Sequence, residues 1–201
     1  MGILYARDFA SFAIHIVALA ICITIHEYAH AKRADMAGDP TPRRSGRLSL
    51  NPIDHYDPLG STLILLFGIG WAKPVPINPY NFRNPRRDAV MVSLWGPLSN
   101  IILAVALGSV VRLAHFANPM VIRLLISIAL LSLILAVFNL IPVPPLDGSH
   151  ILSGLLPLPQ AQRYEFFAAR YGILLLLAAV FLASNLLIRP IMYAFIRFVS
   201  G

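Results

Sequence analysis

The sequence predicts an all-α polytopic membrane protein that forms one membrane-embedded domain over residues 1–201. Hydrophobic residues make up 58% of the chain and charged residues only 12%, whereas a soluble domain averages about 45–50% apolar and about 25% charged residues. Four apolar stretches are long enough to cross a bilayer as helices, which takes roughly 20 residues each. The same composition excludes a disordered chain, and the single cysteine, Cys22, excludes a disulfide scaffold.

The predicted spans follow from the apolar stretches in chain order. Their approximate bounds are Phe9 to Ala31, Ala89 to Val111, Leu124 to Ile141 and Tyr171 to Ile188. A fifth apolar stretch, Leu59 to Trp71, would cover only about 20 Å as a helix, so we predict that it re-enters the membrane rather than crossing it. The basic, amphipathic tail from Arg189 to Val199 is expected to lie in the membrane interface.

The distribution of basic residues predicts the orientation of the spans. Nine of the sixteen Lys and Arg residues lie between the first and second spans, whereas the connection after the second span holds only Arg112 and Arg123. The positive-inside rule therefore places the segment with these nine basic residues in the cytoplasm. The first and third spans both end there, provided that Leu59–Trp71 does not cross. The net charge of +7 suits contact with anionic lipid, and no motif indicates a nucleic-acid partner.

The first span ends in a group of ionisable residues, His26-Glu27-Tyr28-Ala29-His30. Such residues are costly inside a membrane and mark functional sites. His30 follows His26 by one helical turn, so both imidazoles can face one ion, and Glu27 lies close enough to act on a water beside it. This is the H-E-x-x-H arrangement of two zinc ligands and a general base. A buried hydrogen-bonded cluster or an ion-conduction site would also explain such a group.

A catalytic zinc usually takes three protein ligands, and Asp147 is the candidate for the third. No other acidic residue lies between residues 89 and 164, and Asp147 follows a proline-rich turn that begins at Pro142 and ends the third span. Because the first and third spans end on the same side, Asp147 can meet His26 and His30 there. The alternative is that Asp147 only forms a turn after the prolines.

Together these motifs resemble the site-2 protease family of intramembrane zinc metalloproteases. The family pattern pairs H-E-x-x-H in one core helix with N-x-x-P-x-x-x-L-D-G in another, and a G-P-x-x-N element lies between them. The matching residues are His26, Glu27, His30, Gly96, Pro97, Asn100, Asn139, Pro142, Leu146, Asp147 and Gly148. The resemblance covers about residues 10–155, which would form a three-helix catalytic core. A further helix and the interfacial tail would occupy about residues 165–201, so the chain looks like a minimal member without a PDZ-like domain.

The resemblance implies regulated intramembrane proteolysis, in which a zinc-dependent endopeptidase cleaves a transmembrane segment of a membrane-protein substrate near the cytoplasmic face. The implied zinc ligands are His26, His30 and Asp147, and the implied base is Glu27. Asn139 would position the substrate or stabilise the oxyanion, because a side-chain N–H can donate to developing negative charge.

The alternative function is a divalent-metal transporter or ion pathway, which also places His and Asp in membrane spans. Such a pathway normally continues its polar groups across the membrane, whereas the far halves of these spans are apolar apart from His15. We expect a multi-pass protein of a bacterial or archaeal plasma membrane, with its active site toward the cytoplasm. The sequence does not indicate the identity of the substrate, the gating or the oligomeric state.

Two parts of the cytoplasmic segment are predicted to form a small membrane-associated β element that receives an extended substrate. Gly46–Pro52 alternates polar and apolar residues, and the prolines of Trp71–Pro79 limit it to a sheet edge or an irregular loop. We interpret His55 as part of a solvated turn and leave open a supporting role for His150 beside the metal ligands.

Overall fold

The fold is helical, as predicted, in the computed structural model, which describes residues 8–67, 70–113 and 118–200. Four helices in this part of the chain are long and apolar enough to cross a membrane, and each contains most of one predicted span. Their bounds are Phe9–Met36 for α1, Pro85–Leu113 for α4, Pro119–Asn139 for α5 and Leu158–Ala183 for α7. The shorter helical segments are α2 (Thr41–Arg44), η2 (Pro52–His55), α3 (Pro58–Phe67), η3 (Pro79–Asn81), α6 (Asp147–Leu155), the π-helical η4 (Ser184–Ile188) and α8 (Arg189–Ser200).

Capping residues and prolines set the ends of the spans. Asp8 precedes α1, and its carboxylate accepts a hydrogen bond from the backbone N–H of Ser11 at 2.6 Å. Asn118 caps α5 in the same way by accepting from the N–H of Met120 at 2.9 Å. Each cap satisfies a backbone donor that has no partner within the helix. At its other end α5 stops shortly before Pro142, which cannot continue a helix.

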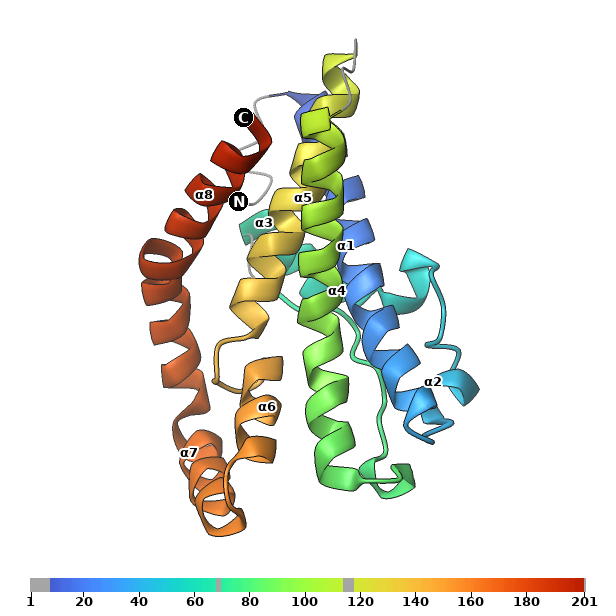
Figure 1. The fold of residues 1–201 in the computed structure, drawn as a ribbon, viewed down its shortest axis with the longest axis vertical. Helices are drawn as coiled ribbons and strands as arrows, with labels where there is room; N and C mark the ends of the chain where they lie inside the picture. Colours follow the sequence, from blue (N-terminus) through green and yellow to red (C-terminus); the bar gives the residue numbers. More distant parts are fainter. Residues whose placement is uncertain (1–7, 68–69, 114–117, 201) are drawn as a thin grey trace.

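Three helices, α1, α4 and α5, pack side by side and form the core (Figure 1). α1 and α5 run in the same direction, and α4 runs in the opposite direction. α5 therefore delivers the turn that follows it to the part of the bundle in which α1 carries His26 and His30. This parallel arrangement of the first and third spans agrees with the prediction from the basic residues.

The segment between α1 and α4 leaves and rejoins the bundle at the same end (Figure 1). From α2 the chain rises to α3 and then returns through η3 to the start of α4. α3 has 10 residues, so it extends only about 15 Å and cannot cross a bilayer. This length agrees with the prediction that the stretch does not cross the membrane, whereas its re-entry stays a prediction; residues 68–69 lie outside the described part of the chain.

The predicted β element is not found: residues 46–52 and 71–79 contain no strand. The first region continues into η2, and the second passes from α3 to η3 without regular structure. One backbone hydrogen bond joins the second region to η2, from the N–H of Lys73 to the carbonyl of His55 at 3.0 Å. A single bond does not make a ladder, and Pro74 and Pro76 have no N–H with which to extend it.

The C-terminal helix α8 continues from η4 and packs against α4 and α5, and the interfacial position of this tail stays a prediction. Phe195 is buried against Ala104 and Ala129, and Arg112 of α4 donates to the carbonyl of Phe198 at 2.9 Å. The amphipathic pattern of the tail thus serves helix packing, because its apolar face meets the outer surface of the core.

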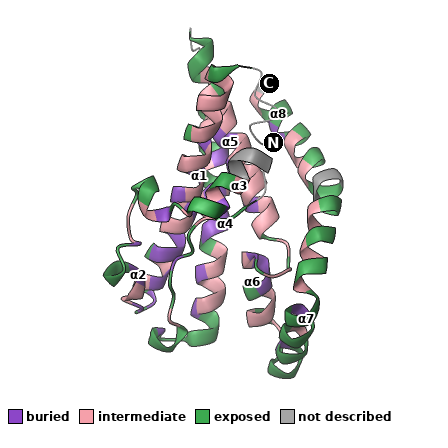
Figure 2. Cartoon of the chain, turned by 180° about the vertical axis from the view of Figure 1, so that it is seen from behind, coloured by how far each residue is buried: buried purple, intermediate pink, exposed green. Residues whose placement is uncertain are grey.

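Burial separates the core from the outer surface of the protein. In Figure 2 the buried residues lie mainly on α1 and α4, whereas α7 is largely exposed. Only 6% of the most apolar part of α7 is buried in the protein, compared with 28% for α4, and its exposed side chains include Ile173, Leu174 and Leu177. Large apolar side chains turned outward suit a lipid environment, and with four apolar helices they indicate a multi-pass membrane protein.

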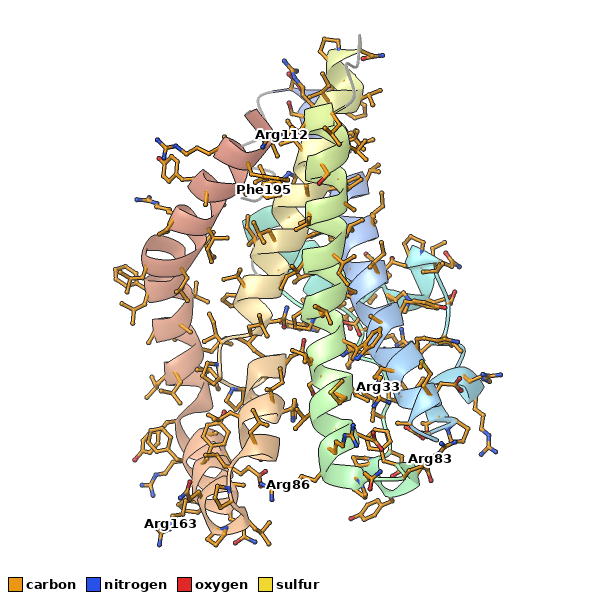
Figure 3. All side chains as sticks on the ribbon, viewed as in Figure 1. Arg33, Arg83, Arg86, Arg112, Arg163 and Phe195 are labelled. Atoms are coloured by element: carbon orange, nitrogen blue, oxygen red, sulfur yellow. The ribbon has the colours of Figure 1, made fainter. Side chains whose placement is uncertain are left out.

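Basic side chains gather at one end of the molecule. Figure 3 shows Arg33, Arg83, Arg86 and Arg163 near the end at which α4 begins, whereas Arg112 lies near the opposite end. Some of these cations hold the fold together at this end. The Arg33 guanidinium donates to Asp88 at 3.0 Å, which joins α1 to α4, and Arg86 donates to the carbonyl of Gly154 in α6 at 2.8 Å.

A buried carboxylate, Asp39, fixes the segment that returns to α4. Its side chain is fully buried and accepts hydrogen bonds from the Thr41 hydroxyl at 2.5 Å, the Asn78 N–H at 2.7 Å and the Asn81 amide at 2.8 Å. Burial opposes ionisation, but these donors outweigh it and hold the pKa of the Asp39 carboxyl below its ordinary value.

Because this pKa is lower in the folded than in the unfolded chain, Asp39 stabilises the fold above the unfolded pKa, and the stabilisation is lost as the pH falls through the folded value. We expect Asp39→Asn to lower the stability at pH 7 by about 1–3 kcal/mol, with a difference from the wild type that shrinks below about pH 4. Thermal unfolding in detergent at several pH values measures this. Asp35→Asn, which removes an ion pair to the exposed Arg43, is the control and should have a smaller effect; an equal effect would contradict the assignment.

Candidate metal centre

Two imidazoles of α1 lie against each other where this helix packs on α4. The ring centroids of His26 and His30 are 4.6 Å apart, and the ring planes are nearly perpendicular, at 84°. Both side chains are buried, and their Nε2 atoms lie 3.1 Å apart. The two rings therefore present the same nitrogen to one point, as the spacing of one helical turn predicted.

Asp147 is the first residue of α6 and reaches α1 through the proline-rich turn after α5. The hydroxyl of Tyr164, on α7, donates to the carbonyl of Pro142 in this turn at 3.1 Å. Gly148 allows α6 to approach the end of α5 closely, because a Cβ at this position would overlap the carbonyl oxygen of Ile141. Backbone packing on both sides thus sets the position of the carboxylate.

The three side chains converge on one point. Asp147 Oδ2 lies 3.2 Å from His26 Nε2 and 3.3 Å from His30 Nε2. In a tetrahedral zinc site with bonds of about 2.0–2.1 Å, ligand atoms lie about 3.3 Å apart, so all three separations fit a single ion. Asp147 Oδ2 is buried and accepts no hydrogen bond, which is costly unless a cation lies beside it. Among the described residues, this is the one group of three His, Cys, Asp or Glu side chains close enough to hold a metal.

α4 supplies the wall behind the two histidines. The Nδ1 of His30 lies 2.8 Å from the carbonyl oxygen of Val92. One turn later, Gly96 has no side chain because there is no room for one: a Cβ would overlap His30 Nε2 and lie 2.8 Å from His26 Cε1. Pro97 is buried inside the helix, and its missing N–H frees the carbonyl of Ser93. The G-P-x-x-N element therefore lies directly beside the metal group.

A cavity of about 660 Å³ opens onto His26, His30 and Asp147. Glu27, Asn139 and His150 line it together with them, so the structure brings all five predicted site residues to one place. Asn139 is half-buried and donates one side-chain N–H to the carbonyl of Leu135 at 2.9 Å. Much of the remaining lining is apolar and includes Trp71, Val75 and Ile77 before η3, and Leu176 and Val180 on α7. A largely apolar cavity with a few converging polar groups is typical of a binding site.

The other histidines that the sequence singled out lie outside the metal group. His55 is buried rather than solvated, and its Nε2 lies 2.8 Å from the Ser49 carbonyl oxygen. His15 is half-buried on α1, eleven residues before His26. His150 follows Asp147 by nearly one turn of α6 and is exposed to the cavity. The interpretation of His55 as a solvated turn residue is therefore wrong, since this last residue of η2 is buried and contacts the preceding segment at Ser49.

Some residues at the site gave no signal in the sequence. Val92 contributes only a backbone carbonyl, which any residue could supply. Leu176 and Val180 are two of many apolar residues on α7, and only the packing of this helix shows which of them face the cavity. A four-residue spacing on α7 could have suggested a common face, but the sequence does not fix how the helix is rotated.

Comparison with known proteins agrees with this geometry. The profile of peptidase family M50 matches residues 106–179, which include Asp147. A protein named "Putative zinc metalloprotease YwhC" from Bacillus subtilis (strain 168) is 42% identical over 166 residues, which cover 75% of each chain. Two proteins named "Putative zinc metalloprotease Rip2" are also similar. The one from Mycolicibacterium smegmatis is 31% identical over 82% of this chain and 65% of its own length. The one from Mycobacterium tuberculosis (strain H37Rv) is 32% identical over 87% of this chain and 69% of its own length.

No solved structure gives a significant match, so the family assignment rests on the sequence relatives and agrees with the three converging side chains. The identity to the Bacillus protein extends over three quarters of both chains, which is enough to establish common membership. The chain belongs to peptidase family M50, the site-2 protease family, and is a zinc metalloprotease.

Proposed function

We propose that this metalloprotease cleaves a transmembrane segment of a membrane-protein substrate near the cytoplasmic face, in regulated intramembrane proteolysis. The observation that carries the proposal is the convergence of His26, His30 and Asp147 beside Glu27 in a cavity between apolar helices. A protease that acted only on soluble peptides would have no need to place its metal ligands among membrane-spanning helices. The cavity instead suits a substrate that arrives within the bilayer.

Each site residue has a distinct part in this proposal. His26, His30 and Asp147 hold the zinc, which when bound supplies a Lewis acid for the scissile carbonyl. Glu27 takes a proton from the attacking water and delivers it to the leaving amide nitrogen. Asn139 has one side-chain N–H engaged with Leu135, and the rest of its amide, on the cavity wall, donates to the developing oxyanion or positions the substrate.

The basic end of the molecule supports a cytoplasmic position for this chemistry. Arg33, Arg83 and Arg86 lie at the end where α1 finishes and α4 begins (Figure 3), and the H-E-x-x-H residues lie in the half of α1 that leads to this end. Under the positive-inside rule this end faces the cytoplasm. The relatives come from bacteria, which favours the plasma membrane of a bacterial cell as the location.

The segment before η3 is the part of the cavity that best suits an extended peptide. Trp71, Val75 and Ile77 line the cavity, and among the described residues the N–H groups of Val75 and Ile77 form no backbone hydrogen bond. An extended substrate can pair with such free backbone groups. By contrast, Leu50 is exposed but does not line the cavity, so the region 46–52 is less well placed to receive a substrate.

We expect Ile77→Asp to reduce cleavage at least about tenfold, because a charge on the cavity wall opposes an apolar substrate, while zinc content stays unchanged. Cleavage of a model transmembrane peptide, measured with zinc content in the same preparation, checks this. Leu50→Asp is the matched control, since it places the same charge on an exposed apolar position outside the cavity. If Leu50→Asp impaired cleavage and Ile77→Asp did not, the substrate would instead enter along the region 46–52.

The proposed function is tested with the purified full chain in liposomes. We expect about one zinc ion per chain and cleavage of a membrane-embedded peptide that stops on chelation and returns when zinc is added. Divalent-metal flux into the liposomes without peptide cleavage would instead support a metal pathway and overturn the proposal. Cleavage of only soluble peptides would retain the metalloprotease but reject its intramembrane substrate.

A further inference from the structure

One face of α4 contacts both ligand histidines. Val92, Gly96 and Asn100 follow one another at four-residue intervals, so they lie along the same side of the helix. Val92 offers its carbonyl to His30, Gly96 leaves space for both rings, and the Asn100 side chain reaches His26. Its Nδ2 lies 3.3 Å from His26 Nδ1.

The metal group determines which nitrogen of each histidine carries a proton. Both rings present Nε2 to Asp147 Oδ2, at 3.2 and 3.3 Å. A neutral imidazole that binds a metal through Nε2 must carry its proton on Nδ1, which is then a donor. For His30 the acceptor is the carbonyl oxygen of Val92, at 2.8 Å. His26 needs an acceptor of the same kind.

Among the described residues, Asn100 is the one whose side chain lies within hydrogen-bond distance of His26 Nδ1, and its Oδ1 has no partner. The side chain is fully buried, and Oδ1 has no hydrogen-bond partner. The Nδ2 group that now faces His26 is a donor and cannot accept the Nδ1 proton. Half a turn of the amide about the Cβ–Cγ bond exchanges the two atoms and turns the acceptor Oδ1 toward the Nδ1 proton of His26.

We infer that Asn100 is a positioning residue for the metal site: its Oδ1 accepts the Nδ1 proton of His26 and thereby fixes the ring with Nε2 toward the metal. The inference rests on the proposed assignment of His26 as a zinc ligand. Val92 and Asn100 together hold the two ligands from one helix, through a main-chain carbonyl in one case and a side-chain carbonyl in the other. Such partners typically contribute 10- to 100-fold in metal affinity.

The competing explanation is that Asn100 only packs between α1 and α4. In that case an apolar residue of similar size would support zinc binding as well as asparagine does, because no hydrogen bond that orients His26 would be lost. The two explanations therefore differ in zinc affinity rather than in the stability of the zinc-free protein.

The test compares the zinc affinity of the full chain with that of Asn100→Leu and Asn100→Asp, measured by competition with a chelator. Leucine has no acceptor, so the affinity should fall about 10- to 100-fold. Aspartate keeps an acceptor oxygen and lacks the donor, so it should restore most of this loss. The control is Ser132→Ala, because Ser132 is also fully buried but contacts Cys22, at 3.1 Å, rather than a histidine.

Unchanged affinity with leucine, or an equal loss with leucine and aspartate in chains that unfold at the same temperature without zinc, would overturn the role of Asn100. The metal site itself would still stand if the wild type binds zinc. A wild type without zinc affinity would overturn both proposals.

A measurement on the unsubstituted protein tests the inference even if the Asn100 variants do not fold. With nitrogen-15-labelled histidine, the zinc-loaded chain should show two zinc-dependent imidazoles that carry a proton on Nδ1 and none on Nε2. A zinc-dependent imidazole with a bare Nδ1 would overturn the inference.

Discussion

Replacing Glu27 by glutamine is expected to abolish peptide cleavage while the protein still binds zinc. Glutamine has the same size as glutamate but cannot take a proton from water, and Glu27 lines the cavity without belonging to the group of three ligand atoms. A general base typically contributes 10²- to 10⁴-fold to a rate, so we expect a loss of that order. Cleavage of a membrane-embedded peptide and the zinc content are measured on the same preparation.

The matched control is Glu165→Gln on α7. Glu165 accepts a hydrogen bond from Ser153 and does not line the cavity, so its replacement should leave cleavage close to that of the wild type. If Glu27→Gln lost zinc together with activity, Glu27 would organise the metal rather than act as a base. If Glu27→Gln cleaved normally, another group would have to accept the proton, and His150, which also lines the cavity, would be the candidate.

Adding one methyl group at Gly96 should have a second large effect, the loss of zinc binding. The Cβ of an alanine would overlap His30 Nε2 and lie 2.8 Å from His26 Cε1, so the rings or α4 must move. Since ligand rings tolerate little displacement, we expect Gly96→Ala to weaken zinc binding at least about 100-fold and to remove activity with it. Chelator competition measures the affinity, and circular dichroism checks that the helices persist.

Gly108→Ala is the control on the same helix. Its Cβ would lie 2.7 Å from the tip of the Phe195 ring, which belongs to the contact between α4 and α8 and is remote from the metal ligands. This variant should loosen the docking of α8 and leave zinc affinity unchanged. Zinc binding of Gly96→Ala at wild-type strength would show that the rings can withdraw, and that α4 does not constrain them.

Much of the site could be predicted from the sequence because its chemistry uses costly residues at fixed spacings. Two histidines one turn apart in an apolar helix, and a lone carboxylate after a broken helix, are rare enough to be recognised. The direction of the spans followed from the basic residues, and so did the meeting of Asp147 with His26 and His30. The structure places these three side chains together without any adjustment to the assignment.

The parts that could not be predicted depend on packing rather than on residue type. The alternation in Gly46–Pro52 is typical of a strand, but a strand needs a partner, and Pro74 and Pro76 remove donors from the neighbouring segment. The pattern of α8 did not indicate that this helix packs against α4, where Gly108 leaves space for Phe195. The sequence around His55 likewise gave no sign that this residue of η2 would be buried.

The distance along the chain between the histidines and Asp147 has a consequence for biogenesis. More than half of the polypeptide separates α1 from α6, so a nascent chain that has inserted only its first two spans offers the metal two imidazoles and no carboxylate. Asp147, the proposed third ligand, follows α5 in the chain and becomes available only after that span has been synthesised. We therefore expect metal capture to be a late step of synthesis. Once captured, the ion ties early and late parts of the chain together, with a stabilisation that rises with the logarithm of its free concentration.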